Sequence, residues 1–449
     1  MNFHNTKLSA FWDTLRTSYW FVPMLMAIGS VALWAVLYNL DTQMESSYVR
    51  RLGWIYTGGP EGAREVLAVI AGSMITVAGV VFSITIVALT LASQQFGPFL
   101  LRNFMRDAGN QIVLGTFIAT FIFCLLTLRT VRGTDTVNFV PQLSVTAGVL
   151  LALLSLGVLI YFIHHVSAFI QASNIISVVS RDLEEAIDRL FPEKLGHGAE
   201  YLRAEEQWEI PERFEAESGP ITVRECGYIK AIDNDALLGA AREHDVVIRL
   251  MKRPGDFVAG NDVIAMVWPA AEVNDSVARA INDSFVIGAQ RTATQDAEFV
   301  VSQIVEVAVR ALSPGINDPF TAVICIDHLG AGLRRLAGRA IPSPLRYDDD
   351  KTLRIIAHPM TFADMVAAAF DQIRHYGRAN ATVTRRLLET IASIAPHIRR
   401  EEDRSALLRQ SEMIERGSRE GIAEEEDCRE VRKLYRAARE ALHAERITV

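Results

Sequence analysis

Few residues in this chain have the types and the spacing that catalysis or metal binding requires. The ten histidines are dispersed, and the sequence contains no P-loop, GxGxxG, GxSxG or HExxH motif. The four cysteines lie about one hundred residues apart, with no CxxC pair and no Cys/His cluster, at Cys124, Cys226, Cys325 and Cys428. The run Asp348-Asp349-Asp350 could attract a cation, but we expect these loop acids to be solvated. We therefore expect no enzyme activity, no metal and no cofactor.

The most distinctive polar motif is RALSPGINDPFT, at residues 310–321. Its candidate functional residues are Arg310, Pro314, Gly315, Asn317, Asp318 and Pro319. Pro314 and Gly315 should end one helix, and Asp318 should cap the next helix, with Pro319 in its first position. The motif then has a purely structural role. The alternative is a ligand site or subunit interface, with a buried ionic cluster behind the loop formed by Arg291, Asp296, Glu306 and Arg310.

A second candidate is a stripe of small and polar side chains inside a long apolar run. Residues 66–101 contain no charged residue and are bounded by Arg64-Glu65 and Arg102. The run is longer than the roughly 20 residues that cross a bilayer core of about 30 Å. At helical spacing one face of it carries Ser73, Thr76, Val80, Ser83, Val87, Thr90 and Gln94.

Two interpretations of this stripe stay open. In the structural one, the hydroxyl groups and the nearby Gly72 and Gly79 allow another membrane helix to pack closely. In the functional one, several copies of the helix line a water-filled path, because membrane helices turn polar groups inward or toward water.

The elements that must position these residues are four apolar runs near the N-terminus. They predict membrane spans at residues 20–40, 66–92, 111–128 and 142–163, within a transmembrane domain of residues 1–170. The fourth run should continue as one long helix that leaves the membrane. After the second run, Gly97-Pro98 predicts a hinge, followed by an amphipathic helix with Arg102 and Arg106. That helix either lies on the membrane surface or is packed in a loop.

The rest of the chain predicts a mixed region. Residues 171–219 are expected to form a helical extension and linker, and residues 220–268 a small β-barrel or sandwich of short β-branched strands. Residues 269–449 show helical periodicity, beginning with Ala270–Arg291, and the last two segments are dense in charge. The predicted fold class is a membrane α-helical domain of four transmembrane helices followed by a cytoplasmic α+β region with a helical C-terminal part.

Charge constrains partners and orientation. The net charge of −8 argues against a nucleic-acid partner. Lys and Arg residues are evenly divided between the two sides of the spans, so the positive-inside rule alone gives a tie. The basic flank before the first span and the lack of a cleavable signal favour both termini in the cytoplasm of a bacterial inner membrane.

Several segments carry a resemblance to a known family. ITVAGVVFSITIVALTLASQQFGPFLLRNFMRD, GYIKAID, RPGDFVAGNDV and RALSPGINDPFTA resemble the signatures of a bacterial family of predicted multi-pass membrane proteins that is classed as a domain of unknown function. The resemblance covers nearly the whole chain. It implies an integral inner-membrane protein with a cytoplasmic C-terminal region, and it transfers no functional residue.

We therefore expect an oligomeric, channel-like protein whose second membrane helix lines a pore and whose cytoplasmic region regulates it. One helix cannot enclose a path, so this function requires a ring of copies. The expected partners are the lipid bilayer, other copies of the chain, and an ion or small ligand whose identity the sequence leaves open. The alternative is a membrane-anchored sensor or scaffold whose cytoplasmic domain binds a ligand or partner.

Overall fold

The computed structural model describes residues 20–43, 55–97, 107–134, 137–169, 171–191 and 210–444. These residues divide into an N-terminal unit that ends at Asn174 and a C-terminal unit that begins at Ile175, and each unit is described by itself.

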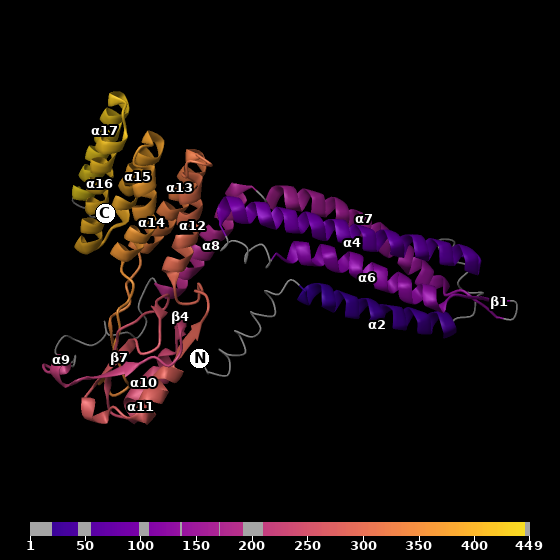
Figure 1. Ribbon diagram of the computed structural model, residues 1–449, viewed down its shortest axis with the longest axis horizontal. Helices are drawn as coiled ribbons and strands as arrows, with labels where there is room; N and C mark the ends of the chain where they lie inside the picture. The colour runs from indigo at the N-terminus through magenta and orange to yellow at the C-terminus, as the bar shows by residue number, and fades with distance from the viewer. Residues whose placement is uncertain are drawn as a thin grey trace. The chain divides into compact units, whose positions relative to one another are not determined.

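The N-terminal unit is a bundle of four apolar helices (Figure 1). They are α2 (Phe21–Gln43), α4 (Pro60–Phe96), α6 (Ala108–Thr130) and α7 (Gln142–Phe169). A small hairpin of β1 (Arg132–Thr134) and β2 (Val137–Phe139) joins α6 to α7. All four helices are long and apolar enough to cross a membrane, so the four predicted spans are confirmed as candidates.

Helix α6 packs against the other three helices, and half of its most apolar window is buried. One core cluster joins Ala78 and Val81 of α4 to Phe117 of α6 and Phe162 of α7. Helix α4 begins six residues before its predicted start, with Pro60 in a first-turn position where its missing N–H costs nothing. It ends at Gly97, whose φ of 102° favours glycine.

Two predictions around these helices have different outcomes. Gly97 does end α4, whereas Pro98, Arg102 and Arg106 lie outside the described residues, and so does the predicted surface helix. The predicted single long helix after residue 142 is wrong. Helix α7 ends at Phe169, Gln171 lies in a bend, and α8 (Ala172–Leu190) begins next.

The C-terminal unit contains a β region with two sheets. The five-stranded sheet has the order β3 (Gly219–Thr222), β7 (Val263–Trp268), β5 (Val247–Leu250), β10 (Leu353–Ile356) and β9 (Leu345–Tyr347). The three-stranded sheet has the order β6 (Phe257–Val258), β4 (Gly227–Ile232) and β8 (Phe285–Gly288). Only the pair β5 and β10 is parallel among these strands.

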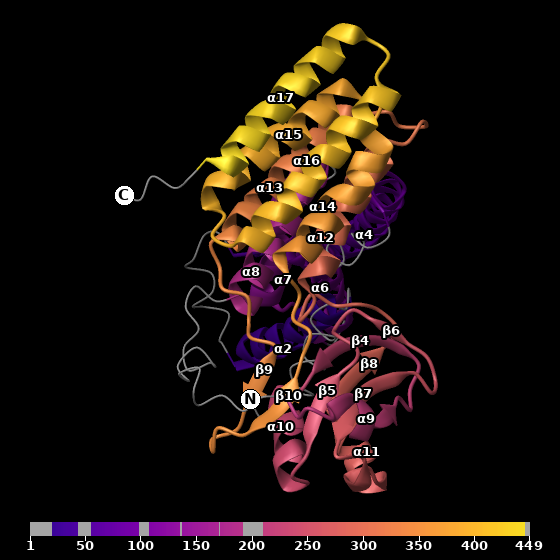
Figure 2. The same cartoon turned by 90° about the vertical axis from the view of Figure 1, so that its left-hand side faces the viewer.

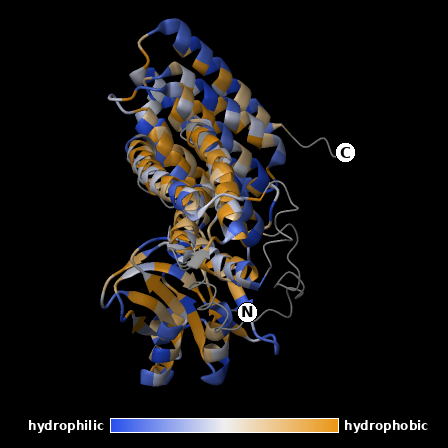
Figure 3. Cartoon of the chain, turned by 90° about the vertical axis from the view of Figure 1, so that its right-hand side faces the viewer, coloured by the Kyte–Doolittle hydropathy of each residue, from blue (hydrophilic) through white to orange (hydrophobic). Residues whose placement is uncertain are grey.

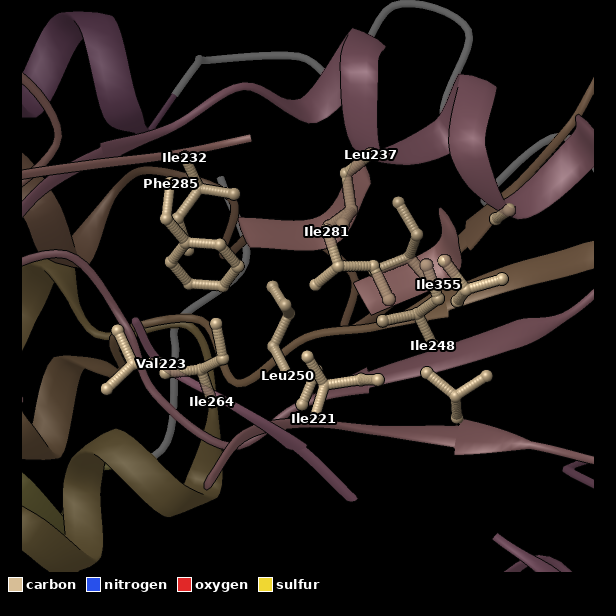
Figure 4. Close-up of a cluster of buried hydrophobic side chains, with 14 of the residues drawn as sticks. Ile221, Val223, Ile232, Leu237, Ile248, Leu250, Ile264, Ile281, Phe285 and Ile355 are labelled. Atoms are coloured by element: carbon tan, nitrogen blue, oxygen red, sulfur yellow. The ribbon is translucent and has the colours of Figure 1, made fainter. Parts of the chain in front are cut away.

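A continuous apolar core holds the β region together (Figure 4). Ile248 and Ile264 of the larger sheet and Ile232 and Phe285 of the smaller sheet share this core. Leu237 of α10 (Asn234–Glu243) and Ile281 of α11 (Asp275–Asp283) complete it. A four-residue helix, α9 (Phe214–Glu217), precedes β3, and a 3-10 turn, η4 (Ala270–Glu272), follows β7.

The structure corrects the extent of the β region. The two sheets form no closed barrel, strand β8 comes from a predicted helix, and strands β9 and β10 come from the C-terminal part, beyond the predicted β domain of residues 220–268. The predicted helix Ala270–Arg291 is instead η4, α11 and β8. Asn274 caps α11 through its side chain, and Ser284 ends the helix after only nine residues.

The remaining helices form an array of three hairpins (Figure 2). The hairpins are α12 (Ala297–Ala311) with α13 (Pro319–Ala337), α14 (Phe362–Gly377) with α15 (Ala381–Ile394), and α16 (Glu401–Gly421) with α17 (Glu425–His443). A short turn, η5 (Ala395–His397), precedes α16. Helix α14 lies between α12 and α16 and contacts both, and α15 contacts both α13 and α17 in the same way. The helix that leads to the C-terminus is largely hydrophilic (Figure 3), in agreement with its predicted density of charge.

Candidate functional site

The stripe on α4 points away from the rest of the N-terminal unit. The buried face of α4 consists of small and apolar side chains, including Ala71, Ala78, Val81, Ala88 and Ala92. At 3.6 residues per turn, the stripe lies on the opposite side of the helix. All seven stripe residues are exposed in the single chain: Ser73, Thr76, Val80, Ser83, Val87, Thr90 and Gln94. The stripe therefore does not pack the four helices of one chain together.

The hydroxyl groups of the stripe are compatible with an apolar environment. Thr76 Oγ1 donates a hydrogen bond of 2.8 Å to the Gly72 carbonyl oxygen, and Thr90 Oγ1 one of 2.9 Å to the Ile86 carbonyl oxygen. Gly72 and Gly79 have open space where a Cβ would be. This face can approach another helix closely without leaving these hydroxyl donors unpaired.

The exposed face of α7 has a different character. Its exposed side chains are large and aliphatic, as in Leu150, Leu153, Leu156, Ile160 and Ile163. Such a surface needs only lipid as its neighbour. The two helices therefore differ in degree: the exposed face of α7 is mostly aliphatic, whereas that of α4 mixes large apolar side chains with a stripe of small and polar groups.

The motif at residues 310–321 forms the turn between α12 and α13. Asp318 caps α13 by accepting hydrogen bonds of 3.1 Å from the backbone N–H groups of Phe320 and Thr321, and Pro319 is in the first turn. The left-handed backbone falls on Asn317, with a φ of 50°. Helix α12 ends at Ala311, before the predicted end at Pro314 and Gly315, and a Cβ at Gly315 would meet no neighbouring atom among the described residues. The cap and the turn explain most of this motif by structure.

The ionic cluster expected behind the motif is divided between the two ends of α12. Asp296 caps the start of α12 and forms a pair of hydrogen bonds with Arg291, at 2.8 and 3.0 Å. Arg310 pairs with Glu306 within the last turns of the same helix, at 3.1 Å. The four residues therefore do not meet in one site.

The pair of Arg291 and Asp296 instead supports the RPGD turn of the β region. Gly255 has a φ of 97°, and a Cβ there would lie 2.9 Å from Asp296 Cγ and 3.0 Å from Arg291 Nη2. Burial opposes the charge of Arg291, but hydrogen bonds to Asp296 and the nearby acids raise the pKa of the guanidinium overall. Next to it, Arg253 bonds Glu298 of α12 at 2.9 Å. These contacts fix the β region to the first helix of the array.

Comparisons with known proteins agree with this architecture. The family model described as "Predicted membrane protein (DUF2254)" matches residues 16–393. The chain belongs to this family. It is similar to uncharacterized proteins of Mycobacterium bovis and of Mycobacterium tuberculosis strain H37Rv, with 32% identity over 427 residues in each case. Those matches cover 94% of this chain and 80% of each relative. No solved structure matches the chain.

Several polar residues of this DUF2254 chain were missed by the sequence analysis. Asp41, in the last turn of α2, caps the start of α7. Its carboxylate accepts hydrogen bonds from the backbone N–H of Leu143 (2.8 Å), the backbone N–H of Ser144 (3.0 Å) and Ser144 Oγ (2.6 Å). Thr120 and Ser155 form a buried hydrogen bond of 3.1 Å between α6 and α7.

A second polar group lies where α6 begins. Asp107 caps α6 and contacts His165 Nε2 of α7 at 2.5 Å. Asn110, which follows in the first turn, is 1% exposed, and neither atom of its amide has a hydrogen-bond partner among the described residues. An Asn directly before an apolar run was the only sequence signal for this position.

The expectation of solvated acids holds for Asp349 and Asp350, which are exposed, but not for Asp348. Asp348 is 8% exposed and accepts hydrogen bonds from Arg354 Nε (2.7 Å) and from the backbone N–H of Thr352 (2.8 Å). Asp349 pairs with Arg242 at 2.7 Å. Among the described residues, no group of three or more His, Cys, Asp and Glu side chains could hold a metal ion.

Proposed function

We propose that this DUF2254 membrane protein assembles into a homo-oligomer in which the α4 helices of several copies line a path for ions or other small solutes. One observation carries the proposal: the stripe from Ser73 to Gln94 is exposed and lies opposite the buried face of α4. The hydroxyl groups of Thr76 and Thr90 are already bonded to the backbone, but membrane helices turn faces with small and polar groups toward protein or water rather than toward lipid.

The contrast with α7 supports assembly through α4. Where α7 exposes leucine and isoleucine, α4 exposes Ser73, Thr76 and Ser83 beside two glycines. Small residues favour close contact between helices from different copies. A closed ring of such copies would place the stripe around its axis, since one narrow helix cannot enclose a path.

The stripe also limits what such a path would select. It carries no charged residue, so a ring of copies would present hydroxyl groups and the Gln94 amide and would favour neither cations nor anions by charge. The C-terminal unit would then regulate the path. We place this unit in the cytoplasm of a bacterial inner membrane, because its cysteines are free thiols and the first span has a basic N-terminal flank.

The experiment combines conductance with cysteine accessibility. The full chain without its native cysteines is reconstituted in planar bilayers, and single cysteines are introduced as Thr76→Cys and Ser83→Cys. Leu153→Cys on the aliphatic face of α7 and Ala78→Cys on the buried face of α4 are matched controls. Charged thiol reagents should block conductance only in the two stripe variants. No conductance under voltage or tension, together with unreactive stripe cysteines, would overturn the proposal.

A second candidate function is a membrane-anchored scaffold or sensor. It is favoured by two apolar side chains at the α12–α13 turn, since Phe320 is 73% exposed and Ile316 is 46% exposed. Exposed apolar side chains at one turn are typical of a contact with a partner protein. Under this function the detergent-solubilised chain would be a monomer in light scattering, and a ring would count against it.

A further inference from the structure

Helices α13 and α15 border a half-open pocket lined mainly by charged and polar residues. The pocket has a volume of about 300 Å³. Helix α13 contributes Asp327, Gly330 and Arg334, and α15 contributes Arg386, Glu389, Thr390 and Ser393, whose hydroxyl group donates to the Thr390 carbonyl oxygen. The pocket is part of neither the α4 stripe nor the α12–α13 turn, so binding there does not require assembly of the chain.

The spacing of these residues explains why the pocket exists. On α13 they are separated by three and four residues, and on α15 by three, one and three, so each set shares one helix face. Asp327 contacts Arg386, and Gly330 contacts Thr390, so the two helices run in the same direction (Figure 2). Gly330 has no side chain, and a Cβ there would collide with the Thr390 methyl group. Because Gly330 has no side chain, the two helices approach each other closely there, and the pocket lies next to this contact.

The acidic end of the pocket is built around Arg386. Its Nε and Nη2 atoms donate to the two carboxylate oxygens of Asp327, at 2.5 and 2.8 Å. Its Nη1 atom donates to Glu389 at 3.1 Å. These hydrogen bonds raise the pKa of Arg386 and fix its position. Two carboxylates around one guanidinium leave a surplus of one negative charge at this end.

The opposite end carries a free positive charge. Arg334 is exposed, lines the pocket, and has no ion-pair partner among the residues that the structure describes. Helical side chains lean toward the N-terminus of their helix, and for Arg334 that is the direction of Gly330. Thr390 is buried, and within the described part of the chain its hydroxyl group makes no hydrogen bond.

We propose that this pocket binds a small zwitterion. The ammonium group of the ligand would lie against Asp327 and Glu389, and its oxyanion would accept hydrogen bonds from Arg334 and the Thr390 hydroxyl group. A ligand of a single charge would leave one end of the pocket uncompensated. The volume is at the lower limit of ligand pockets, which suits a molecule of the size of an amino acid.

The test measures thermal unfolding of the full chain in detergent with a panel of probes. The zwitterions are the standard amino acids, β-alanine and γ-aminobutyrate, each at about 10 mM, which saturates a site of millimolar affinity or better. Acetate and ethylammonium at equal ionic strength are the single-charge controls. At least one zwitterion should raise the Tm by about 2 °C or more, because a ligand bound only by the folded state stabilises it. Neither single-charge probe should do so.

Variants separate the pocket from general effects. Arg334→Gln on α13 and Thr390→Val on α15 should remove the Tm shift. Arg385→Gln is the control and should keep the shift, because Arg385 is on α15 but outside the pocket lining. Arg334 is exposed, so its variant should fold like the natural chain. The proposal is overturned if no zwitterion raises the Tm, if acetate does so equally, or if the shift persists in Arg334→Gln.

Discussion

The pair of Arg291 and Asp296 gives the most quantitative prediction for the C-terminal unit. Asp296 is 1% exposed, accepts two hydrogen bonds from Arg291 and caps α12 by accepting the Phe299 N–H. Asn caps helices about as well as Asp, so Asp296→Asn removes the charge and keeps the cap. Asp296→Ala removes both.

The two variants should therefore differ in a defined order. Losing one partner of a buried ion pair costs about 3–5 kcal/mol. The Arg291 side chain is 25% exposed, so water compensates part of that loss, and we expect about 2–4 kcal/mol for Asp296→Asn. Loss of the cap should add about 0.5–2 kcal/mol in Asp296→Ala.

Calorimetry of the full chain in detergent measures both changes as shifts of the transition of the C-terminal unit. For a unit of this size, about 1 kcal/mol corresponds to about 2–4 °C, so Asp296→Asn should lower the Tm by roughly 10 °C. Gly255→Ala should act in the same direction, because its Cβ would displace the pair. Asp275→Asn, an exposed acid in the first turn of α11, is the control and should change stability by less than about 1 kcal/mol. A shift for Asp296→Asn no larger than that of the control would refute the assigned role of the pair.

Three further predictions follow from the contacts. Burial tends to raise the pKa of Asp348, but the hydrogen bond from Arg354 and nearby backbone N–H groups outweigh it and hold the pKa below its usual range. The stability that results is present above the unfolded pKa of about 3.9 and is lost as pH falls through the lower folded pKa. Below about pH 4 the Tm of Asp348→Asn should therefore fall less steeply with pH than the Tm of the natural chain. Asp41→Ala should destabilise the helical bundle by about 1–3 kcal/mol, measured by thermal unfolding, because the start of α7 loses its cap, and Asp41→Asn should lose less. Gly332→Ala should lower the Tm of the C-terminal unit, since its Cβ would lie 2.7 Å from Leu183 Cδ2 of α8, and an unchanged Tm would show that α8 can move away.

The membrane part of the fold could be predicted because its signal is local. Each span is a single run of apolar residues, and length alone identifies it. The two strands Leu345–Tyr347 and Leu353–Ile356 carry no comparable signal. They are three and four residues long, and β10 pairs with Ile248, more than one hundred residues earlier in the chain. Pairing over that distance depends on packing in the shared core, which periodicity does not describe.

The candidate site could be predicted only in part from the sequence. Periodicity places Ser73, Thr76 and Ser83 on one face of α4, but it does not say whether that face is covered by the same chain. Only the packing of α6 and α7 against the opposite face shows that the stripe is exposed. Asp41 was missed for the same reason, because its partner is the start of a helix one hundred residues later in the chain.

Helix α4 differs from its neighbours in having small residues on two faces. Ala71, Ala78 and Ala88 bring it close to α6 and α7 within one chain, and Gly72 and Gly79 leave room on its outer side between larger exposed side chains such as Ile75. Large aliphatic side chains serve on a side that meets only lipid, as most do on α7, so the combination of two glycines with the polar stripe favours a protein neighbour. Small residues on two sides suit a helix that packs against its own bundle on one side and against the same helix of another copy on the other. The proposed path along α4 therefore depends on assembly first and on the polar groups of the stripe second, so a monomeric particle would remove its physical basis.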